Sequence, residues 1–149
     1  MPKKCFTVGE ANEMLPLIER TLGRVFQMRQ QLEQIDRELK MADAAPEDRE
    51  NFEVIIENAS MGVTNRRAAI KALQSAIEDE LVQLELRGAI VRDVEAGRID
   101  WHYCDGERDI HLCWKLGEPE VTHWHDAQDG CTARRSLDDL RAASGEDTD

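Results

Sequence analysis

Apolar residues recur every three or four positions in two long stretches of this chain, which predicts two long amphipathic helices. The first stretch begins after Thr7, an N-cap residue followed three positions later by Glu10, the spacing of a capping box. Its apolar stripe comprises Leu15, Ile18, Leu22, Val25, Met28, Leu32, Ile35 and Leu39. The second stripe comprises Phe52, Ile56, Ala59, Val63, Ile70, Leu73, Ile77, Leu81 and Leu84, before a helix-ending glycine, Gly88.

Three features modify this helical pattern. Pro16 lies inside the first stripe, so a kink or a short separate first helix is expected there. Residues 42–48 form a short break, and Pro46 suits the first turn of the next helix. Arg66 is the one charge in the second stripe, where it either snorkels or fixes the register against an acidic partner. Because the break is short, we expect the helices to pack antiparallel as a coiled-coil hairpin over residues 7–88.

Beyond Gly88 the helical spacing gives way to strict alternation, which predicts β-strands. Asp105-Gly106 is a strong two-residue hairpin signal between two alternating runs. With these two residues as the loop, Trp101 lies opposite Ile110, Asp100 opposite His111 and His102 opposite Asp109. Apolar residues then meet apolar residues across the pair.

A third strand, residues 121–125, follows a break at residues 117–119, and two registers are open to it. A three-residue loop places His123 opposite Cys113, Trp124 opposite Leu112 and His125 opposite His111. A four-residue loop exposes Trp124 and turns both histidines to the apolar side. We favour the first register because it buries the tryptophan.

The expected fold class is therefore α+β: a long antiparallel two-helix hairpin followed by a small three-stranded antiparallel β-meander. We expect a single domain over residues 1–137, with the β element in residues 89–137. Residues 138–149, acidic and rich in small side chains, are expected to be disordered.

Charge and cysteine usage narrow the function classes. Lys plus Arg number 19 against 31 Asp plus Glu, a net charge of −12 that disfavours nucleic-acid binding. No apolar run approaches the roughly 20 residues of a membrane span, and the N-terminus carries no secretion signal. The cysteines, Cys5, Cys104, Cys113 and Cys131, form no C-x-x-C pair. We therefore expect reduced thiols in a cytoplasmic protein and no disulfide framework.

Four further apolar residues lie beside the helical seams, where a two-helix hairpin leaves them uncovered: Leu17, Phe26, Ile55 and Leu86. We expect the sheet to cover part of this apolar surface and a second copy of the chain to cover the rest, so we predict a homodimer.

In the favoured register one face of the sheet collects the side chains that suit zinc or another transition metal: Asp100, His102, His111, Cys113, His123 and His125. The metal-ligand candidates are His111, His123 and His125, with a divalent metal as the cofactor. The competing interpretation is the ordinary solvated face of an amphipathic sheet, which we prefer because no metal-binding spacing is present. A third is nucleophilic chemistry by Cys113 or Cys104 beside a histidine.

Three segments resemble the bacterial domain-of-unknown-function family 2203: FTVGEANEMLP, GAIVRDVEAGRIDW and LCWKLGEPEVTHWHDAQDGCTARRSL. The resemblance runs to about Leu137 and is most specific in its C-terminal pattern. It implies a shared site made of Trp114, Glu118, Trp124, His125 and Arg134. The family pattern has an aromatic residue and a proline where this chain has Cys131 and Ser136, and it does not include His102, His111 or His123.

The family has no assigned activity, so the resemblance supplies no mechanism, and whether the chain is an enzyme stays open. The leading hypothesis is a non-enzymatic oligomeric interaction protein, in which Glu118, His125 and Arg134 form a polar network at a sheet or subunit boundary. The alternative is a metal-binding or metal-dependent hydrolytic protein that uses the histidines of the sheet.

Overall fold

The computed structural model describes residues 4–42, 52–106, 108–130 and 133–144. Its contacts group the chain into two compact units, residues 23–80 and residues 1–22 together with 81–149. The single domain expected over residues 1–137 stays a prediction. None of the helices in the described residues is long and apolar enough to cross a membrane.

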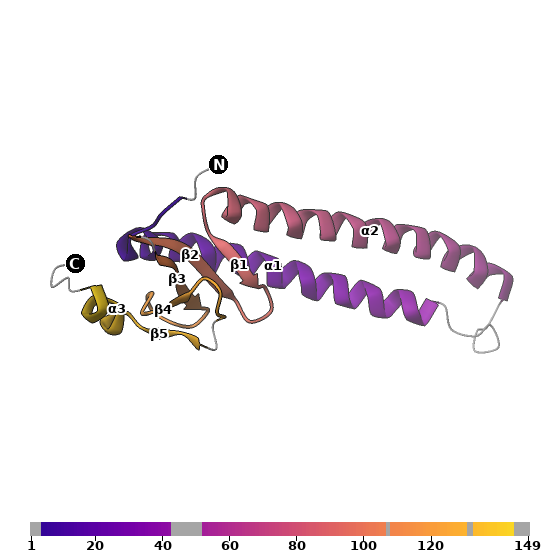
Figure 1. The fold of residues 1–149 in the computed structure, drawn as a ribbon. Helices are drawn as coiled ribbons and strands as arrows, with labels where there is room; N and C mark the ends of the chain where they lie inside the picture. Colours follow the sequence, from indigo (N-terminus) through magenta and orange to yellow (C-terminus); the bar gives the residue numbers. More distant parts are fainter. Residues whose placement is uncertain (1–3, 43–51, 107, 131–132, 145–149) are drawn as a thin grey trace. The chain divides into compact units, whose positions relative to one another are not determined.

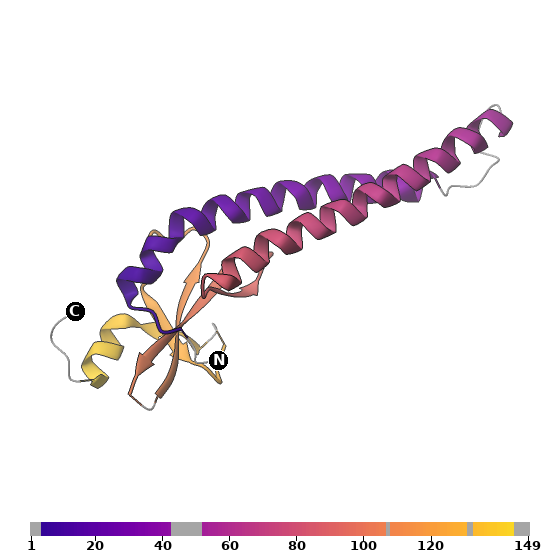
Figure 2. The same cartoon turned by 90° about the horizontal axis from the view of Figure 1, so that it is seen from above.

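Two long helices form the helical hairpin that the apolar stripes predict. Helix α1 spans Val8–Ala42 and helix α2 spans Phe52–Leu86, and within residues 23–80 they run antiparallel, side by side (Figures 1 and 2). Arg24 donates two hydrogen bonds to the carboxylate of Glu80, at 2.9 and 3.0 Å. Arg66, the charge in the second stripe, lies 3.6 Å from Glu38, the acidic partner that would fix the register.

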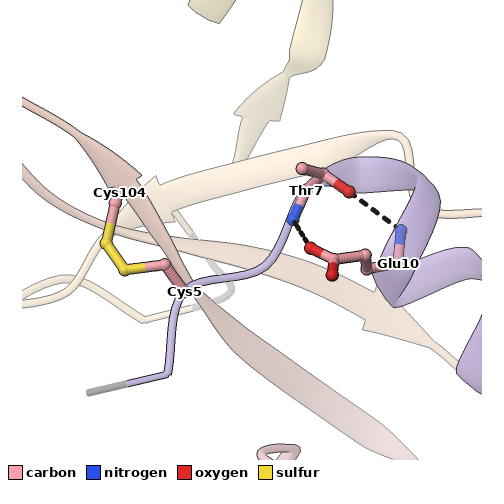
Figure 3. The surroundings of a disulfide bond; sticks show 4 residues. All are labelled: Cys5, Thr7, Glu10 and Cys104. Atoms are coloured by element: carbon pink, nitrogen blue, oxygen red, sulfur yellow. Dashed lines mark hydrogen bonds between the residues drawn. A yellow bond between two sulfur atoms is a disulfide. The ribbon is translucent and has the colours of Figure 1, made fainter. Parts of the chain in front are cut away.

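Helix α1 begins with the predicted capping box (Figure 3). The hydroxyl of Thr7 accepts from the backbone N–H of Glu10 at 3.0 Å, and the carboxylate of Glu10 accepts from the N–H of Thr7 at 2.9 Å. The helix continues through Pro16 without interruption, so the separate first helix does not form. The break expected around Pro46 lies outside the described residues.

Helix α2 ends at Leu86, and the predicted helix-ending glycine, Gly88, follows it by two residues. Gly88 has a φ of +103°, a conformation that L side chains rarely adopt. A Cβ atom at this position would also lie 2.5 Å from the ring of Phe6. Gly88 therefore lets the chain turn out of the helix while the buried ring of Phe6 packs against it.

The sheet is antiparallel and has five strands in the order β1-β2-β3-β4-β5, followed by a short helix, α3 (Figure 1). The bounds are β1 Ile90–Asp93, β2 Arg98–Asp105, β3 Arg108–Lys115, β4 His123–Asp126, β5 Arg135–Ser136 and α3 Leu137–Ser144. The three predicted strands are its centre. The edge strands β1 and β5, of four and two residues, are too short for an alternation pattern to reveal. Helix α3 lies where we expected disorder.

The register predicted for the β2–β3 hairpin was wrong. Asp105 pairs with Arg108, so the loop begins at Gly106 and not at Asp105. Gly106 takes a φ of +60° as the first loop residue, which the primed hairpin turns require at that position. Consequently His102 lies opposite His111 and Asp100 lies opposite Cys113. The faces are unchanged, because each partner moved by two residues.

The favoured register of the third strand is confirmed. Strand β4 pairs with β3 so that His125 lies opposite His111, Trp124 opposite Leu112 and His123 opposite Cys113. Trp124 is buried, as that register requires, and its indole N–H donates to the carbonyl of Ser136 at 3.0 Å.

The core of the sheet-containing unit lies between the apolar face of the sheet and the first turns of α1. The indole N–H of Trp101 contacts the sulfur of Met14 at 3.4 Å, and the backbone N–H of Val121 donates to the side chain of Asn12 at 2.7 Å. The buried apolar side chains include Ala11, Leu15, Ile18, Leu22, Ile99, Trp101, Ile110, Leu112, Trp114 and Trp124.

The expectation of reduced thiols was wrong for Cys5 and Cys104. Cys5 and Cys104 form a disulfide across 99 residues of sequence (Figure 3). The N–H of Phe6 donates to the carbonyl of His102 at 2.8 Å, which holds the N-terminal segment against β2. That contact brings the two Cα atoms to 5.5 Å, the spacing that a disulfide needs. A spacing rule such as C-x-x-C cannot reveal a pair so far apart.

Removal of this disulfide should lower the stability of the fold strongly, because the bond closes a loop of about 100 residues in the unfolded chain. Cys5→Ser or Cys104→Ser should lower the free energy of unfolding by about 4 kcal/mol, measured by urea denaturation. The double variant should lose no more than either single variant. An unchanged urea midpoint in both single variants would contradict the disulfide.

Candidate metal-binding site

The polar face of the sheet is organised around Asp100, whose side chain is fully buried. Three side chains approach its Oδ2 atom: Arg92 Nε at 3.0 Å, His111 Nδ1 at 3.3 Å and His125 Nε2 at 2.9 Å. Arg92 reaches this position because the β1–β2 register shifts between Val91 and Asp93. A bulge of this kind redirects a side chain within a strand.

Asp100 is ionised in this setting. Burial raises the pKa of its carboxyl, but the hydrogen bond from His111, the charge of His125 and the hydrogen bond from Arg92 together outweigh burial. The net pKa lies below its usual value. A carboxylate that accepts several donors is stabilised in the charged form even where water is excluded.

The surroundings of His125 require a proton on each ring nitrogen. Nδ1 lies 2.8 Å from the backbone carbonyl of Asp126, and Nε2 lies 2.9 Å from the carboxylate of Asp100. A carbonyl and an ionised carboxylate can only accept hydrogen bonds, so both nitrogens donate. We therefore assign His125 as an imidazolium, which forms a buried ion pair with Asp100.

His111 differs from His125, because only one of its nitrogens has an oxygen partner. Nδ1 lies 3.3 Å from Asp100 and 3.5 Å from Nη2 of Arg92. The shorter contact, to an ionised acceptor, places the proton on Nδ1. In the neutral form of this ring Nε2 is a lone-pair acceptor, and Nε2 is buried without a hydrogen-bond partner among the residues that the structure describes. A buried acceptor with no donor requires an explanation.

Two further metal-ligating side chains lie beside His111. The ligand atoms of His102, Asp109 and His111 lie within 4.8 Å of one another. The fold produces this arrangement directly, because His102 pairs with His111 across the β2–β3 ladder and Asp109 precedes His111 by two residues on the same face. Two imidazoles and one carboxylate are a donor set that zinc and iron(II) accept.

A second group, Asp100, Cys113 and His125, is equally compact but chemically unsuited. Arg92 and His125 already neutralise the carboxylate of Asp100. Cys113 is disulfide-bonded, so its sulfur offers no thiolate. Cys131 lies outside the described residues. The nucleophilic role considered for Cys113 or Cys104 requires a free thiol, and neither cysteine has one in this structure.

Of the three metal candidates expected from the sequence, the structure brings two to Asp100 and separates the third. His111 and His125 both contact the same carboxylate oxygen. The Nδ1 atom of His123 contacts the hydroxyl of Thr122 at 2.8 Å, and its charge lowers the pKa of Glu118. His123 therefore belongs to a different polar cluster.

The five residues implied by the resemblance do not form one cluster. Arg134 makes a bidentate ion pair with Glu118, at 2.8 and 3.1 Å, and Trp114 donates to the carbonyl of Glu118 at 2.9 Å. Trp124 is buried on the apolar face, with the guanidinium of Arg135 5.5 Å from its ring. His125 contacts Asp100 instead. Of the predicted network of Glu118, His125 and Arg134, the structure therefore shows only the ion pair of Glu118 and Arg134.

Around Asp100 the polar face is not the solvated surface that we preferred from the sequence. Asp100, His111 and His125 are exposed by 0, 5 and 1%, respectively. Arg92 and the segment of residues 127–130 lie beside Asp100 and line the same pocket. Neither had a sequence signal, since a bulge and an irregular loop carry no periodicity.

The comparisons with known proteins agree with the resemblance. The family model described as "Uncharacterized conserved protein (DUF2203)" matches residues 4–137. The chain belongs to this family. No curated protein and no solved structure matches the chain. The family carries no assigned activity, so the function has to be argued from the side chains on the sheet.

The pair of Glu118 and Arg134 predicts an acid-sensitive contribution to stability. Burial raises the pKa of Glu118, but hydrogen bonds from Arg134 and the Lys115 amide, with the charges of Arg134 and His123, bring it below its usual value. The pair therefore stabilises the fold above the ordinary glutamate pKa, and this contribution is lost as pH falls through the lowered value.

Glu118→Gln should accordingly lower the free energy of unfolding by about 1–3 kcal/mol at pH 7 and by less near pH 2.5, measured by urea denaturation. Glu120→Gln, at an exposed neighbouring position, is the control and should change neither value. Equal losses in Glu118→Gln at both pH values would contradict the ion pair.

Proposed function

We propose that this protein binds one divalent transition-metal ion on the polar face of its sheet, through His102, Asp109 and His111. Two observations on His111 carry the proposal: its Nε2 atom is buried without a hydrogen-bond partner among the described residues, and the residue belongs to a compact group of metal-ligating side chains. A metal ion would satisfy this lone pair where no donor does.

The ligand spacing supports binding after a small adjustment. Ligand atoms about 2.0–2.2 Å from one ion lie roughly 3.0–3.5 Å apart. The ligand atoms of the three side chains lie within 4.8 Å of one another, so they have to approach by at most about 1.3–1.8 Å. Asp109 is exposed and His102 is half-buried, so an ion can enter from solvent. Three protein ligands leave coordination positions for water, the arrangement that zinc hydrolases and non-haem iron enzymes use.

Asp100 would act on the metal through His111. A metal-ligating histidine usually donates its other N–H to a carboxylate or a carbonyl, which fixes the tautomer and the ring orientation. Here Nδ1 of His111 makes that contact, and Arg92 and His125 hold the carboxylate in place. In this proposal His125 supports the site without touching the ion.

A calorimetric titration of the purified chain with zinc tests the proposal. We expect about one ion per chain, and loss of binding in His102→Ala and His111→Ala. Asp100→Asn should bind roughly 10–100-fold more weakly, because the orienting carboxylate becomes an amide. Cobalt(II) in place of zinc should give visible absorption bands that the same variants lose.

His123→Ala is the matched control, since it removes a histidine of the same face that contacts Thr122 instead. It should bind zinc like the unaltered chain, and circular dichroism should show that every variant is folded. Stoichiometric binding that survives His111→Ala, or an absence of binding in the unaltered chain, would overturn the proposal.

A second candidate role, that of an oligomeric interaction protein, rests on the helical hairpin. Among residues 23–41 and 62–80, Val25 is the one buried apolar side chain. Met41 and Leu86 are each 75% exposed, and Leu86 is one of the positions for which we expected a cover. A second copy of the chain would cover these helices. The cytoplasmic location expected from the sequence is likewise a proposal.

The homodimer has a direct test in light scattering at micromolar concentration. We expect a mass of twice 17.0 kDa. Leu86→Glu should shift the mass toward one chain, while Glu85→Gln, at the adjacent exposed position, should not. A mass of one chain for the unaltered protein would contradict the homodimer.

A further inference from the structure

A pocket of about 470 Å³ opens beside the polar face of the sheet. Residues from β1, β2 and the segment after β4 line it: Arg92, Asp93, Arg98, Asp100 and residues 127–130. Its volume is in the range of sites that hold small molecules. His102, Asp109 and His111 do not line the pocket, so it is separate from the proposed metal ligands.

Arg98 is the unexplained charge in this pocket. Among the described residues we find no hydrogen-bond or ion-pair partner for its guanidinium, and its Nε atom is buried. Arg92, on the neighbouring strand, has its charge matched by Asp100 at 3.0 Å. A guanidinium that lines a pocket and has no matching carboxylate indicates an anionic ligand.

We propose that this pocket binds a small organic acid, whose carboxylate is held by Arg98. The planar guanidinium presents paired N–H donors that match the two oxygens of a carboxylate. This site does not depend on the metal proposed above.

The other charges in the pocket narrow the class of acid. Asp93 and Asp129 also line it, and the carboxylate of Asp93 is fixed by accepting the N–H of Ala96 at 3.0 Å. Two carboxylates repel a second anionic group, but they accept hydrogen bonds from an ammonium or a hydroxyl. The ligand class is therefore an amino acid or a hydroxy acid that carries a single carboxylate.

Three probes of nearly equal shape separate these contributions: alanine, lactate and propionate. They share a carboxylate and differ in carrying an ammonium, a hydroxyl or only hydrogen at the α-carbon. In an NMR titration of the full chain, alanine or lactate should shift the side-chain Nε–H signal of Arg98, with a Kd of about a millimolar for so small a ligand. Propionate should bind several-fold more weakly.

The same ligands should shift the backbone amide signals of Ala127 and Gln128, which line the pocket. Arg98→Gln should abolish these backbone shifts, whereas Arg87→Gln, at an exposed arginine just after α2, should leave them and the Arg98 shift unchanged. Absence of any Arg98 shift with both alanine and lactate would overturn the site, and equal affinity for propionate would overturn the ligand class. The titrations are run with a chelator present. Binding that appears only after zinc is added would place the acid on the metal and contradict this proposal.

Discussion

A carboxylate that is removed from water has to be matched by donors or cations, and this requirement at Asp100 organises the polar face of the sheet. Arg92, His111 and His125 come from three different strands and meet at one oxygen of this side chain. Because burial opposes its charge, the ionised state persists only while these partners remain in place. These side-chain contacts connect β1, β3 and β4 to β2, and backbone ladders connect β2 to β1 and β3 as well.

The two histidines differ because their surroundings differ. His125 has an acceptor at each nitrogen and serves as a cation, while His111 has an oxygen partner at one nitrogen and keeps a lone pair at the other. A single carboxylate therefore fixes the charge of one ring and the tautomer of the other. The second effect would orient Nε2 of His111 for the metal ion that we propose it shares with His102 and Asp109.

Periodicity predicted the helices and strands whose apolar residues are regularly spaced, and it missed the features that have no such spacing. The helical stripes, the capping box at Thr7 and the pairing of His125 with His111 all follow from spacing and parity. The bulge that redirects Arg92 and the disulfide between Cys5 and Cys104 depend on contacts far apart in the sequence. The hairpin loop begins one residue later than the Asp-Gly pair predicted, because the glycine takes the first loop position and Asp105 stays in the strand.

The protonation of His111 in the metal-free chain is the most direct test of the role assigned to Asp100. Two-bond ¹H–¹⁵N correlation spectra of the imidazole rings distinguish the two neutral tautomers from the imidazolium. We expect His111 to carry its proton on Nδ1 alone, and His125 to carry protons on both nitrogens. A proton on Nε2 of His111 would contradict the assignment, because that nitrogen would then have no lone pair to offer a metal.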